Sequence, residues 1–507
     1  MPGSSPPRRA TALMVLGTAS DVGKSVTTAA LCRIFRDDGI DVAPFKAQNM
    51  ALNSYATRDG LEIGRAQAVQ AHAARLEPSA DMNPILLKPG GDAFSQVVLN
   101  GRILGTLTAQ EYYARRFELF GEVRKAYARL AARHELIVLE GAGSPVEMNL
   151  KHLDMVNLAM AEHADAKCVL VADIDRGGVF AQLVGTYALL EPEERERFCG
   201  FIINRFRGDP RLLGDAVPYL EHRTGHRCLG VVPYLRDLGI DEEDSLVLGA
   251  RPPARNGLRI GAVLLRSMAN FTDFDPLARI EGVAFSYVRN AAEIRDLDVV
   301  ILPGSKNTVH DLEDLRARGV AAAVIAHERA GKSIVGICGG LQMLGHTIDD
   351  PHGVEGGARH TPGLALLDVN TSMSAVKTTR QVTGAFADRT RFGDAAVCGY
   401  EIHVGETTRG DVEPLFVLTR TGSGEVVEDG AIRRDGRVLG TYVHGLFDEP
   451  ACAHALIDHL RELAGLEPLG ADAIAPRADP YEQLAAHFRA HLDLSALYEA
   501  IGMRAPA

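Results

Sequence analysis

The stretch TALMVLGTASDVGKSVTTAALCRIFRDDG at residues 11–39 decides the fold of the first part of the chain. Its apolar opening predicts a short buried strand over residues 11–17, and VTTAALCRIFRDDG predicts a helix over residues 26–39. The loop between them, GTASDVGKS (17–25), is rich in small residues. In such a strand–loop–helix unit the backbone N–H groups converge on phosphate oxygens, and the helix N-terminus adds favourable partial charge. We therefore expect a phosphate-binding loop.

Particular side chains of this loop are expected to contact phosphate and metal. Lys24 would reach the terminal phosphates, and the Ser25 hydroxyl would ligate Mg²⁺. Gly23 fills the second glycine position of the motif, whereas Thr18 stands where the strict pattern requires the first glycine. A chance glycine-rich turn is the alternative, but the flanking strand and helix favour a phosphate loop.

A carboxylate should complete the Mg²⁺ site. Glu140 ends the apolar run LIVLE and precedes Gly-Ala-Gly, so it can face the loop across the edge of the sheet. Asp173 and Asp175 end another predicted strand and are weaker candidates, because a helix cap explains an aspartate there equally well. Lys46 and Lys88 could neutralise phosphate or a substrate carboxylate, or they could simply be solvated.

Alternating strand-like and helical segments favour parallel sheets covered by helices on both faces. We expect an α/β protein of two doubly wound domains with mainly parallel sheets. A stretch rich in proline and glycine predicts a linker between them, and a second set of buried strands follows it. The predicted divisions are a disordered N-terminus (1–10), a first domain (11–244), the linker (245–257), a second domain (258–450) and a C-terminal helical extension (451–507).

The second chemical signal is the stretch SIVGICGGLQMLG at residues 333–345. Cys338 follows a buried strand and precedes an apolar helix, and Gly336-x-Cys338-x-Gly340 has the spacing of a nucleophile elbow. The N-terminus of the helix favours the thiolate form of the cysteine. A small buried apolar residue is the alternative, and the paired glycines count against it. The other six cysteines lack this context and are expected to serve in packing.

A cysteine nucleophile also needs a base and an oxyanion hole. His444, in TYVHGLF, is the best candidate base, and His403, in GYEIHVGET, is the second. The amide of Gly339 is one expected oxyanion donor. The amide that follows Gly304, in the strand–loop LPGSKNT, is the other, because this loop also leaves the carboxyl edge of the sheet.

Composition excludes several classes of protein. The length of 507 residues suggests several domains, and 54 basic against 66 acidic side chains give a net charge of −12. This balance argues against non-specific binding to nucleic acid or to an anionic membrane. No apolar run approaches the roughly 20 residues that span a bilayer, and the first residues do not read as a signal peptide. Seven cysteines without a Cys-x-x-Cys pair indicate reduced thiols and a cytoplasmic location.

Together these motifs resemble a known family. The second part resembles a class I glutamine amidotransferase domain, with GICGGLQ as its nucleophile turn. The first part looks like a dethiobiotin-synthetase-type P-loop domain, through GTxSxxGKS and EGAG. The two parts in this order are similar to the cobyric acid synthase family. Further matching strings are KAQNMALNS (46–54), NPILLKP (83–89), EGAGSPVEMNL (140–150), DIDRGGVFA (173–181), NRFRGD (204–209) and LPGSKNT (302–308).

The resemblance implies ATP-dependent amidation of four carboxylates (b, d, e and g) of a corrin, adenosylcobyrinic acid a,c-diamide, with glutamine as the nitrogen donor. It implies that Cys338 attacks glutamine and that His444 is the base. It also implies that Gln342 contacts glutamine and that Asn204 reads adenine. Leu446 stands where many class I amidotransferases carry the glutamate of a triad, so the group that orients His444 stays open.

Three other functions remain as alternatives. An amidotransferase for the a and c carboxylates of the same corrin shares both domains, and the strings KAQNM and DIDRGGVFA disfavour it. A P-loop regulatory ATPase with a non-catalytic second part would hydrolyse no glutamine. An amidotransferase for a cell-wall precursor is disfavoured by the acidic balance and by the lack of a membrane-facing amphipathic stretch.

Overall fold

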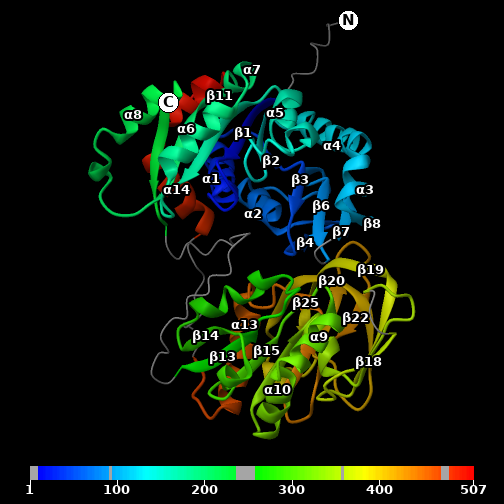
Figure 1. Cartoon of the computed structure of the whole chain (residues 1–507). Helices are drawn as coiled ribbons and strands as arrows, with labels where there is room; N and C mark the ends of the chain where they lie inside the picture. The colour runs from blue at the N-terminus through cyan, green and yellow to red at the C-terminus, as the bar shows by residue number, and fades with distance from the viewer. Residues whose placement is uncertain (1–9, 91–93, 236–256, 356–358, 470–478, 507) are drawn as a thin grey trace, which may run out of the picture. The chain divides into compact units, whose positions relative to one another are not determined.

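The computed structural model describes residues 10–90, 94–235, 257–355, 359–469 and 479–506. The chain forms two compact units, which Figure 1 colours along the sequence. Unit 1 draws on Met1–Ala51, Glu62–Ser245 and Arg477–Ala507, and unit 2 on Leu52–Leu61 and Leu246–Pro476. The predicted linker, apart from Gly257, and the predicted N-terminal segment, apart from Ala10, lie outside the described residues.

Unit 1 is built on a parallel sheet of six strands in the order β12-β11-β10-β1-β9-β2. These strands are β1 (Thr11–Gly17), β2 (Val42–Phe45), β9 (Leu136–Glu140), β10 (Lys167–Asp173), β11 (Phe198–Phe206) and β12 (Cys228–Pro233). The helices of the unit are α1 (Lys24–Asp37), α2 (Arg65–Ala73), α3 (Ala109–Ala114), α4 (Arg116–Ala131), α5 (Leu158–Ala164), α6 (Val179–Leu189), α7 (Pro192–Arg195), α8 (Ala216–Thr224), α14 (Pro480–His491) and α15 (Leu494–Ala500). A smaller sheet has the order β3 (Gln48–Met50), β6 (Ile85–Pro89), β7 (Phe94–Leu99), β8 (Arg102–Thr108).

Strand β1 is apolar throughout because both of its faces are covered. Met14 and Leu16 belong to one buried cluster, which includes Leu119 of α4, whereas Leu13 and Val15 belong to a second cluster with the apolar side of α1. A parallel strand between two helical layers has no solvent face, so its sequence does not alternate. The predicted strand over 11–17 is confirmed, and the helix begins two residues earlier than predicted.

Unit 2 contains a second six-stranded sheet in the order β14-β13-β15-β16-β24-β23, parallel except for β23. Its strands are β13 (Leu258–Val263), β14 (Val283–Val288), β15 (Val299–Leu302), β16 (Ser333–Ile337), β23 (Ala431–Ile432) and β24 (Val438–Thr441), and its helices are α9 (Thr308–Ala317), α10 (Val320–Arg329), α11 (Gly339–Leu344), α12 (Arg389–Phe392) and α13 (Pro450–Leu463). A mainly antiparallel sheet joins it, formed by β17 (Thr347–Asp349), β18 (His360–Pro362), β19 (Val369–Phe386), β20 (Ala396–Arg409), β21 (Phe416–Arg420), β22 (Val426–Asp429) and β25 (Val443–His444). The predicted α/β class with two mainly parallel sheets is therefore confirmed.

The structure divides the tail that the sequence treats as one helical extension, residues 451–507. Helix α13 packs in unit 2, where Leu456 and Ile457 are fully buried. Helices α14 and α15 instead cover α1 in unit 1, where the rings of Tyr498 and Phe35 meet edge to face with centroids 5.4 Å apart. The two ends of the tail carry separate apolar faces, and each is buried in a different core.

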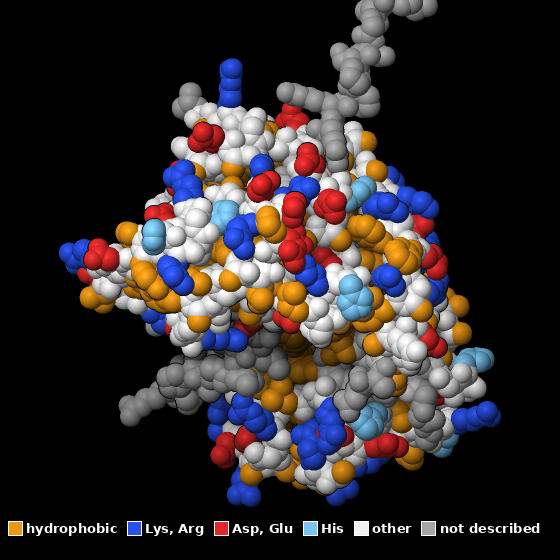
Figure 2. All heavy atoms as spheres, turned by 45° about the horizontal axis from the view of Figure 1, so that its top comes forward, with side chains coloured by type: hydrophobic (Ala, Val, Ile, Leu, Met, Phe, Trp, Pro, Cys, Tyr) orange, Lys and Arg blue, Asp and Glu red, His pale blue; other side chains and the backbone are white. Residues whose placement is uncertain are grey.

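Charged side chains of both signs are intermixed on the face of the molecule seen in Figure 2. That face carries no broad basic patch, in keeping with the acidic balance of the sequence. Among the described residues, no helix is both long enough and apolar enough to cross a membrane.

Phe488 of α14 should be essential for the stability of unit 1, because it is 2% exposed in the core that α14 shares with α1. Truncating a buried phenylalanine to alanine costs about 3–5 kcal/mol, so Phe488→Ala should lower the free energy of unfolding by that amount. The free energy of unfolding is measured by urea denaturation, with hydrogen exchange of the α1 amides as the probe. The control Phe117→Ala removes a ring that is 74% exposed and should change stability by less than about 0.5 kcal/mol. Equal effects of the two substitutions would contradict this packing.

Candidate active site

A pocket of about 220 Å³ opens in unit 1 beside the loop between β1 and α1. Its lining includes the carboxyl ends of β9 and β11 and segments that follow β1 and β2 in the chain. Ligands bind at the carboxyl ends of the strands in open α/β sheets. Its lining includes the charged and polar side chains of Lys24, Ser25, Lys46, Asn49, Glu140 and Arg205.

The loop reaches α1 through Gly23, whose φ of 95° is left-handed and therefore suits glycine. A side chain at Gly23 would also collide with the amide of Asn204, which lies 2.1 Å from the position of an added Cβ. Lys24 is buried, and its ammonium group donates hydrogen bonds to the carbonyls of Ala19 (2.8 Å) and Gly143 (3.2 Å). The positive charge is thus held over the loop.

Thr18 and Asn204 lie behind the loop rather than in the lining of the pocket. The Thr18 N–H donates to Val171 of β10 (2.9 Å), and its hydroxyl donates to Gln182 (3.1 Å). The Asn204 amide donates to the carbonyl of Val22 (3.0 Å). Both side chains therefore fix the shape of the loop in this structure.

Glu140 is the centre of a buried hydrogen-bond network. One carboxylate oxygen accepts from the Ser25 hydroxyl (2.8 Å) and from the Lys46 ammonium (2.9 Å), and the other accepts from the Gln70 amide. Burial alone would raise the pKa of Glu140, but the Lys46 charge and these hydrogen bonds hold it below its ordinary value. Glu140 is therefore a carboxylate at neutral pH, in contact with the side chain expected to ligate metal.

The donor set suits Mg²⁺, which prefers hard oxygen ligands and takes only one or two of them from a protein that also binds phosphate. Ser25 and Glu140 supply such a pair. In the part of the chain that the structure describes, no group of three or more His, Cys, Asp and Glu side chains could hold a metal ion by itself. Asp173 and Asp175, the weaker candidates, instead pair with arginines of the segment that ends β11.

Three basic side chains near this edge differ in their surroundings. Lys46 and Lys88 are both buried, so the prediction that they could be solvated is wrong for each. Lys88 forms an ion pair with Glu62, with 2.8 Å between the ammonium nitrogen and a carboxylate oxygen, and it does not line the pocket. Arg205 does line the pocket, and its guanidinium is held by Asp21 and by Asp173 at 3.2 Å each. The sequence analysis assigned no role to Arg205.

The candidate nucleophile of unit 2 sits on a strained turn. Cys338 has a φ of 52°, is 7% exposed, and joins β16 to α11. A Cβ on Gly336 would lie 2.7 Å from the backbone of Gly340, and a Cβ on Gly340 would lie 1.9 Å from the Leu302 carbonyl oxygen. Glycine on both sides of the cysteine is therefore a steric requirement of the turn, as the Gly-x-Cys-x-Gly spacing predicts.

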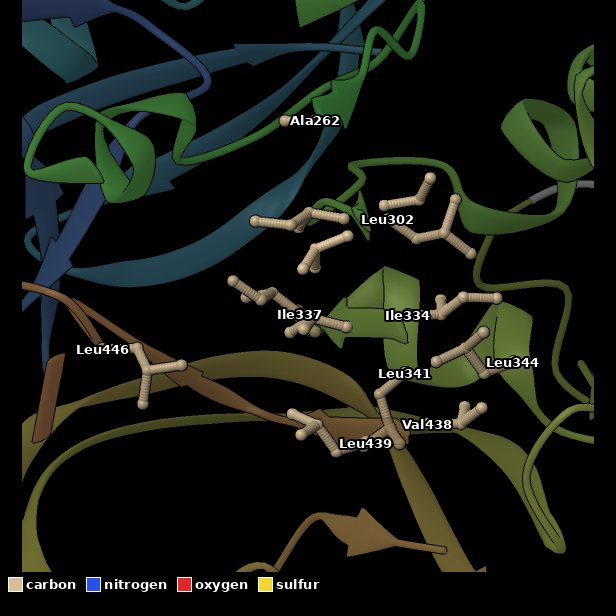
Figure 3. Close-up of a cluster of buried hydrophobic side chains, with 14 of the residues drawn as sticks. Ala262, Leu302, Ile334, Ile337, Leu341, Leu344, Val438, Leu439 and Leu446 are labelled. Atoms are coloured by element: carbon tan, nitrogen blue, oxygen red, sulfur yellow. The ribbon is translucent and has the colours of Figure 1, made fainter. Parts of the chain in front are cut away.

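A buried apolar cluster packs against this turn. Figure 3 labels Ile337 and Leu341, which flank the cysteine in sequence, among side chains of β15, β16, α11 and β24. Leu446 lies in the same cluster and is fully buried. The residue that replaces the glutamate of many class I amidotransferases therefore belongs to the core.

His444 is oriented by an aspartate that the sequence analysis did not find. The His444 Nδ1 atom lies 2.7 Å from a carboxylate oxygen of Asp273, whose other oxygen accepts from the N–H of Gly445 at 3.0 Å. The imidazole also hydrogen-bonds with the Cys338 side chain. Asp273 lies in the short 3-10 helix η4 (Phe271–Phe274), after β13. Cys338, His444 and Asp273 thus form one chain of hydrogen bonds.

This arrangement changes the protonation of His444. Burial, the largest single influence, would lower its pKa, but the Asp273 carboxylate and the hydrogen bonds to Asp273 and Cys338 raise it to about 10. Because the folded-state pKa lies above the ordinary value of about 6.5, the interaction stabilises the fold fully below pH ~6.5. That stabilisation is lost as pH rises through about 10. At neutral pH the His444 ring is therefore an imidazolium.

The two glycines expected at the oxyanion hole lie beside this chain. A Cβ on Gly304 would lie 3.1 Å from His444 Cε1 and 3.7 Å from Cys338 Cβ. A Cβ on Gly339 would lie 2.9 Å from the backbone nitrogen of Ser305. A side chain at Gly304 would therefore crowd His444 and Cys338, and a side chain at Gly339 would collide with the loop that follows Gly304.

Gln342 is buried, and neighbouring side chains hold its amide group. Its oxygen accepts from the Thr308 hydroxyl (3.0 Å), and its nitrogen donates to the Tyr442 hydroxyl (3.1 Å). His403, the second candidate base, stacks on Tyr442 with ring centroids 3.9 Å apart and bonds the Gly405 carbonyl at 2.7 Å. The structure therefore brings His444, and not His403, to the cysteine.

No local pattern in the sequence links Asp273 to His444, because 171 positions separate the two residues. One signal was present. Asp273 follows β13, and the carboxyl ends of β13, β15 and β16 share an edge of the sheet with the turn that carries Cys338. An acidic residue on any loop of that edge is therefore a candidate partner for the base.

Two families match the two parts of the chain. The CobQ/CobB/MinD/ParA nucleotide binding domain matches residues 13–247, and the CobB/CobQ-like glutamine amidotransferase domain matches residues 259–452. The fold and the two sites therefore define a glutamine amidotransferase that carries a P-loop nucleotide-binding domain.

Similar proteins extend over nearly the whole chain. A cobyric acid synthase from Syntrophobacter fumaroxidans is 48% identical over 98% of this chain and 99% of its own length. A cobyric acid synthase from Bacteroides fragilis is 49% identical over 96% of this chain and 97% of its own length. The chain belongs to the cobyric acid synthase family. A solved glutamine amidotransferase structure matches 41% of this chain and 100% of its own length, with 20% identity and a TM-score of 0.30.

The pKa of His444 should depend on Asp273. In Asp273→Asn the carboxylate charge is removed while burial remains, so the pKa of His444 should fall from about 10 to below the ordinary value of about 6.5. An NMR titration of labelled histidine measures it. The control Asp314→Asn removes another buried, ion-paired carboxylate of unit 2, and there His444 should still titrate near 10. A His444 that keeps its high pKa in Asp273→Asn would contradict this assignment.

Proposed function

We propose that this chain catalyses the ATP- and glutamine-dependent amidation of the b, d, e and g carboxylates of adenosylcobyrinic acid a,c-diamide. The observation that carries the proposal is that one chain combines a buried Cys338–His444–Asp273 hydrogen-bond chain with a phosphate-loop pocket. The names of the relatives that match almost all of the chain supply the substrate.

In unit 2 the proposed reaction releases ammonia from glutamine. The Cys338 thiolate attacks the carbon of the glutamine side-chain amide, and the resulting oxyanion is stabilised by the amides of Gly339 and of the residue after Gly304. The protonated His444 gives its proton to the leaving nitrogen, and ammonia departs, leaving a thioester. His444 then takes a proton from water, which attacks the thioester and releases glutamate. Asp273 holds the imidazole in orientation throughout.

Gln342 is proposed to shape the wall of the glutamine site. Its amide group is already hydrogen-bonded, because its oxygen accepts from Thr308 and its nitrogen donates to Tyr442. Such fixed polar groups shape a pocket without reorganising when the ligand binds.

In unit 1 the proposed reaction activates a carboxylate of the corrin. A carboxylate oxygen attacks the terminal phosphorus of ATP, the bond to ADP breaks, and an acyl phosphate forms. Ammonia then attacks the acyl carbon, and phosphate leaves as the amide forms. Lys24 and Arg205 line the pocket and are proposed to neutralise the charge of the transferring phosphoryl group. Asn204 lies outside the pocket lining, and its proposed contact with adenine rests on the family resemblance alone.

Mg²⁺ is proposed to accompany ATP, with the Ser25 hydroxyl and the Glu140 carboxylate as its protein ligands. When bound, the ion would neutralise phosphate charge during transfer. Lys46 keeps Glu140 ionised and thus ready to serve as a ligand.

The cytoplasmic location remains a proposal. All seven cysteines are free thiols in the structure, which supports a reducing compartment.

The regulatory ATPase alternative is disfavoured, because a merely binding module has no need for the strained Cys338 turn and its buried base. Mass analysis with each corrin acid supplied in turn separates the remaining corrin alternative: four amides added to the a,c-diamide support our proposal. Two amides added to the unamidated corrin acid, with none added to the a,c-diamide, contradict it.

Cys338→Ala should abolish glutamine-dependent amidation, by roughly 10⁴-fold or more, and spare amidation from high ammonium. The reason is that ammonia supplied from solution bypasses the thiol. Amide formation is followed by mass spectrometry with each nitrogen source. The matched control Cys398→Ala removes an exposed thiol of the same unit and should leave both activities intact. Loss of both activities in Cys338→Ala, with the fold retained, would refute the assignment.

Lys24→Ala should reduce amidation from glutamine and from ammonium alike, by about 10²–10³-fold, because activation of the carboxylate precedes both. Glutamine hydrolysis measured alone should persist. Lys125→Ala removes an exposed lysine of unit 1 and serves as the control. Ammonium-dependent amidation at the wild-type rate in Lys24→Ala would remove the phosphate-loop argument.

A further inference from the structure

Segment Leu52–Leu61 comes from the first half of the sequence but belongs to unit 2. In the sequence it falls in the predicted first domain (11–244), within and just after the string KAQNMALNS. Its strand β4 (Ser54–Ala56) packs on β20, where Ala56 shares a small buried cluster with Tyr400 and Ile402. This segment lies next to the candidate glutaminase site.

The first contact is a reciprocal pair of hydrogen bonds at the start of η4. The side-chain oxygen of Asn53 accepts from the backbone N–H of Phe271 (3.1 Å), and that of Asn270 accepts from the backbone N–H of Ser54 (2.9 Å). Asn53, Ser54 and Asn270 are each at most 3% exposed. Buried, charge-free hydrogen bonds of this kind fix backbone position, because a broken one would leave a polar group unsatisfied.

This pair holds the turn that carries Asp273. Asn270 has a left-handed φ of 53°, a conformation that is uncommon for a residue other than glycine. Three residues later, Asp273 meets His444 Nδ1 at 2.7 Å and the Gly445 N–H at 3.0 Å. The hydrogen bonds from the segment thus act at the base of the turn, and the carboxylate lies at its other end.

The second contact reaches the face of the imidazole. Tyr55 packs on Tyr400 with ring centroids 5.1 Å apart, and Tyr400 stacks on His444 with centroids 5.5 Å apart and planes 25° from parallel. The same short segment therefore supports His444 from two sides, through the carboxylate that bonds its nitrogen and through the ring that covers its face.

We propose that Asn53 and Tyr55 are positioning residues of the glutaminase triad, so that the glutamine site is incomplete without this segment from the first half of the chain. The inference rests on the proposed function. Neither residue is placed to touch the sulfur; Asn53 acts through Asp273, and Tyr55 acts through Tyr400.

The test uses the full chain carrying Asn53→Ala. Because a misplacement of about 1 Å in a catalytic group costs about 10²-fold, kcat for glutamine hydrolysis should fall about 10- to 100-fold, with KM changed less than about threefold. The pKa of His444, read by NMR, should fall below its value of about 10, and ammonium-dependent amidation should be unchanged. In an Asp273→Asn background, Asn53→Ala should add no further loss, because its effect passes through that carboxylate.

Two further comparisons separate positioning from general loss of structure. Tyr55→Leu should lower kcat for glutamine, whereas Tyr55→Phe, which keeps the ring on Tyr400, should restore it. The control Thr57→Ala lies in the same segment, and the Thr57 hydroxyl bonds to Asp59 and Leu61 of that segment, so glutamine hydrolysis should be unaffected.

Three outcomes would overturn the inference: a folded Asn53→Ala with wild-type kcat and His444 pKa, an equal fall in ammonium-dependent amidation, or losses that multiply with Asp273→Asn. Failure of the proposed function looks different, because glutamine hydrolysis would then survive Cys338→Ala. Loss in Cys338→Ala together with an unaffected Asn53→Ala would reject only the inference drawn here.

Discussion

The buried contact between Asp273 and His444 is the constraint on which the glutaminase site depends. Burial by itself would lower the pKa of the His444 imidazole, which is almost completely buried, and so favour its neutral form. A neutral ring would give Cys338 no cationic partner. The carboxylate at 2.7 Å reverses this preference and raises the pKa of His444 to about 10. The glycine turn, the loop at Gly304 and the 3-10 helix η4 can all be understood as the means of bringing these groups together.

The phosphate-loop pocket uses buried charge in a similar way. Lys46 and Glu140 form an ion pair with side chains that are 6% and 1% exposed, an arrangement that is costly unless every remaining polar atom is well bonded. Ser25 and Gln70 supply those bonds. In both sites the pair sets the protonation state of one buried group, Glu140 in the pocket and His444 in the glutaminase site.

The chain exchanges segments between its two units. Leu52–Leu61 leaves the first half of the sequence to pack in unit 2, and the last helices, α14 and α15, return to cover α1 in unit 1. Neither unit can therefore be cut from the chain at a single point. If Asn53 and Tyr55 position the triad as we propose, the hydrolysis of glutamine depends on the same stretch of sequence that supplies Lys46 and Asn49 to the nucleotide pocket.

The sequence by itself determined the elements whose chemistry is local. The phosphate loop ending at Lys24 and the glycine-flanked turn of Cys338 are set by neighbours a few residues away, because backbone sterics and helix termini act over that range. Only the tertiary structure decided which side chains meet these turns: Asp273 for His444, and the segment around Asn53 for the turn of Asp273. Their partners are separated by 171 and 218 positions. Such contacts arise from the packing of strand edges and loops, which leaves no periodic signal in the sequence.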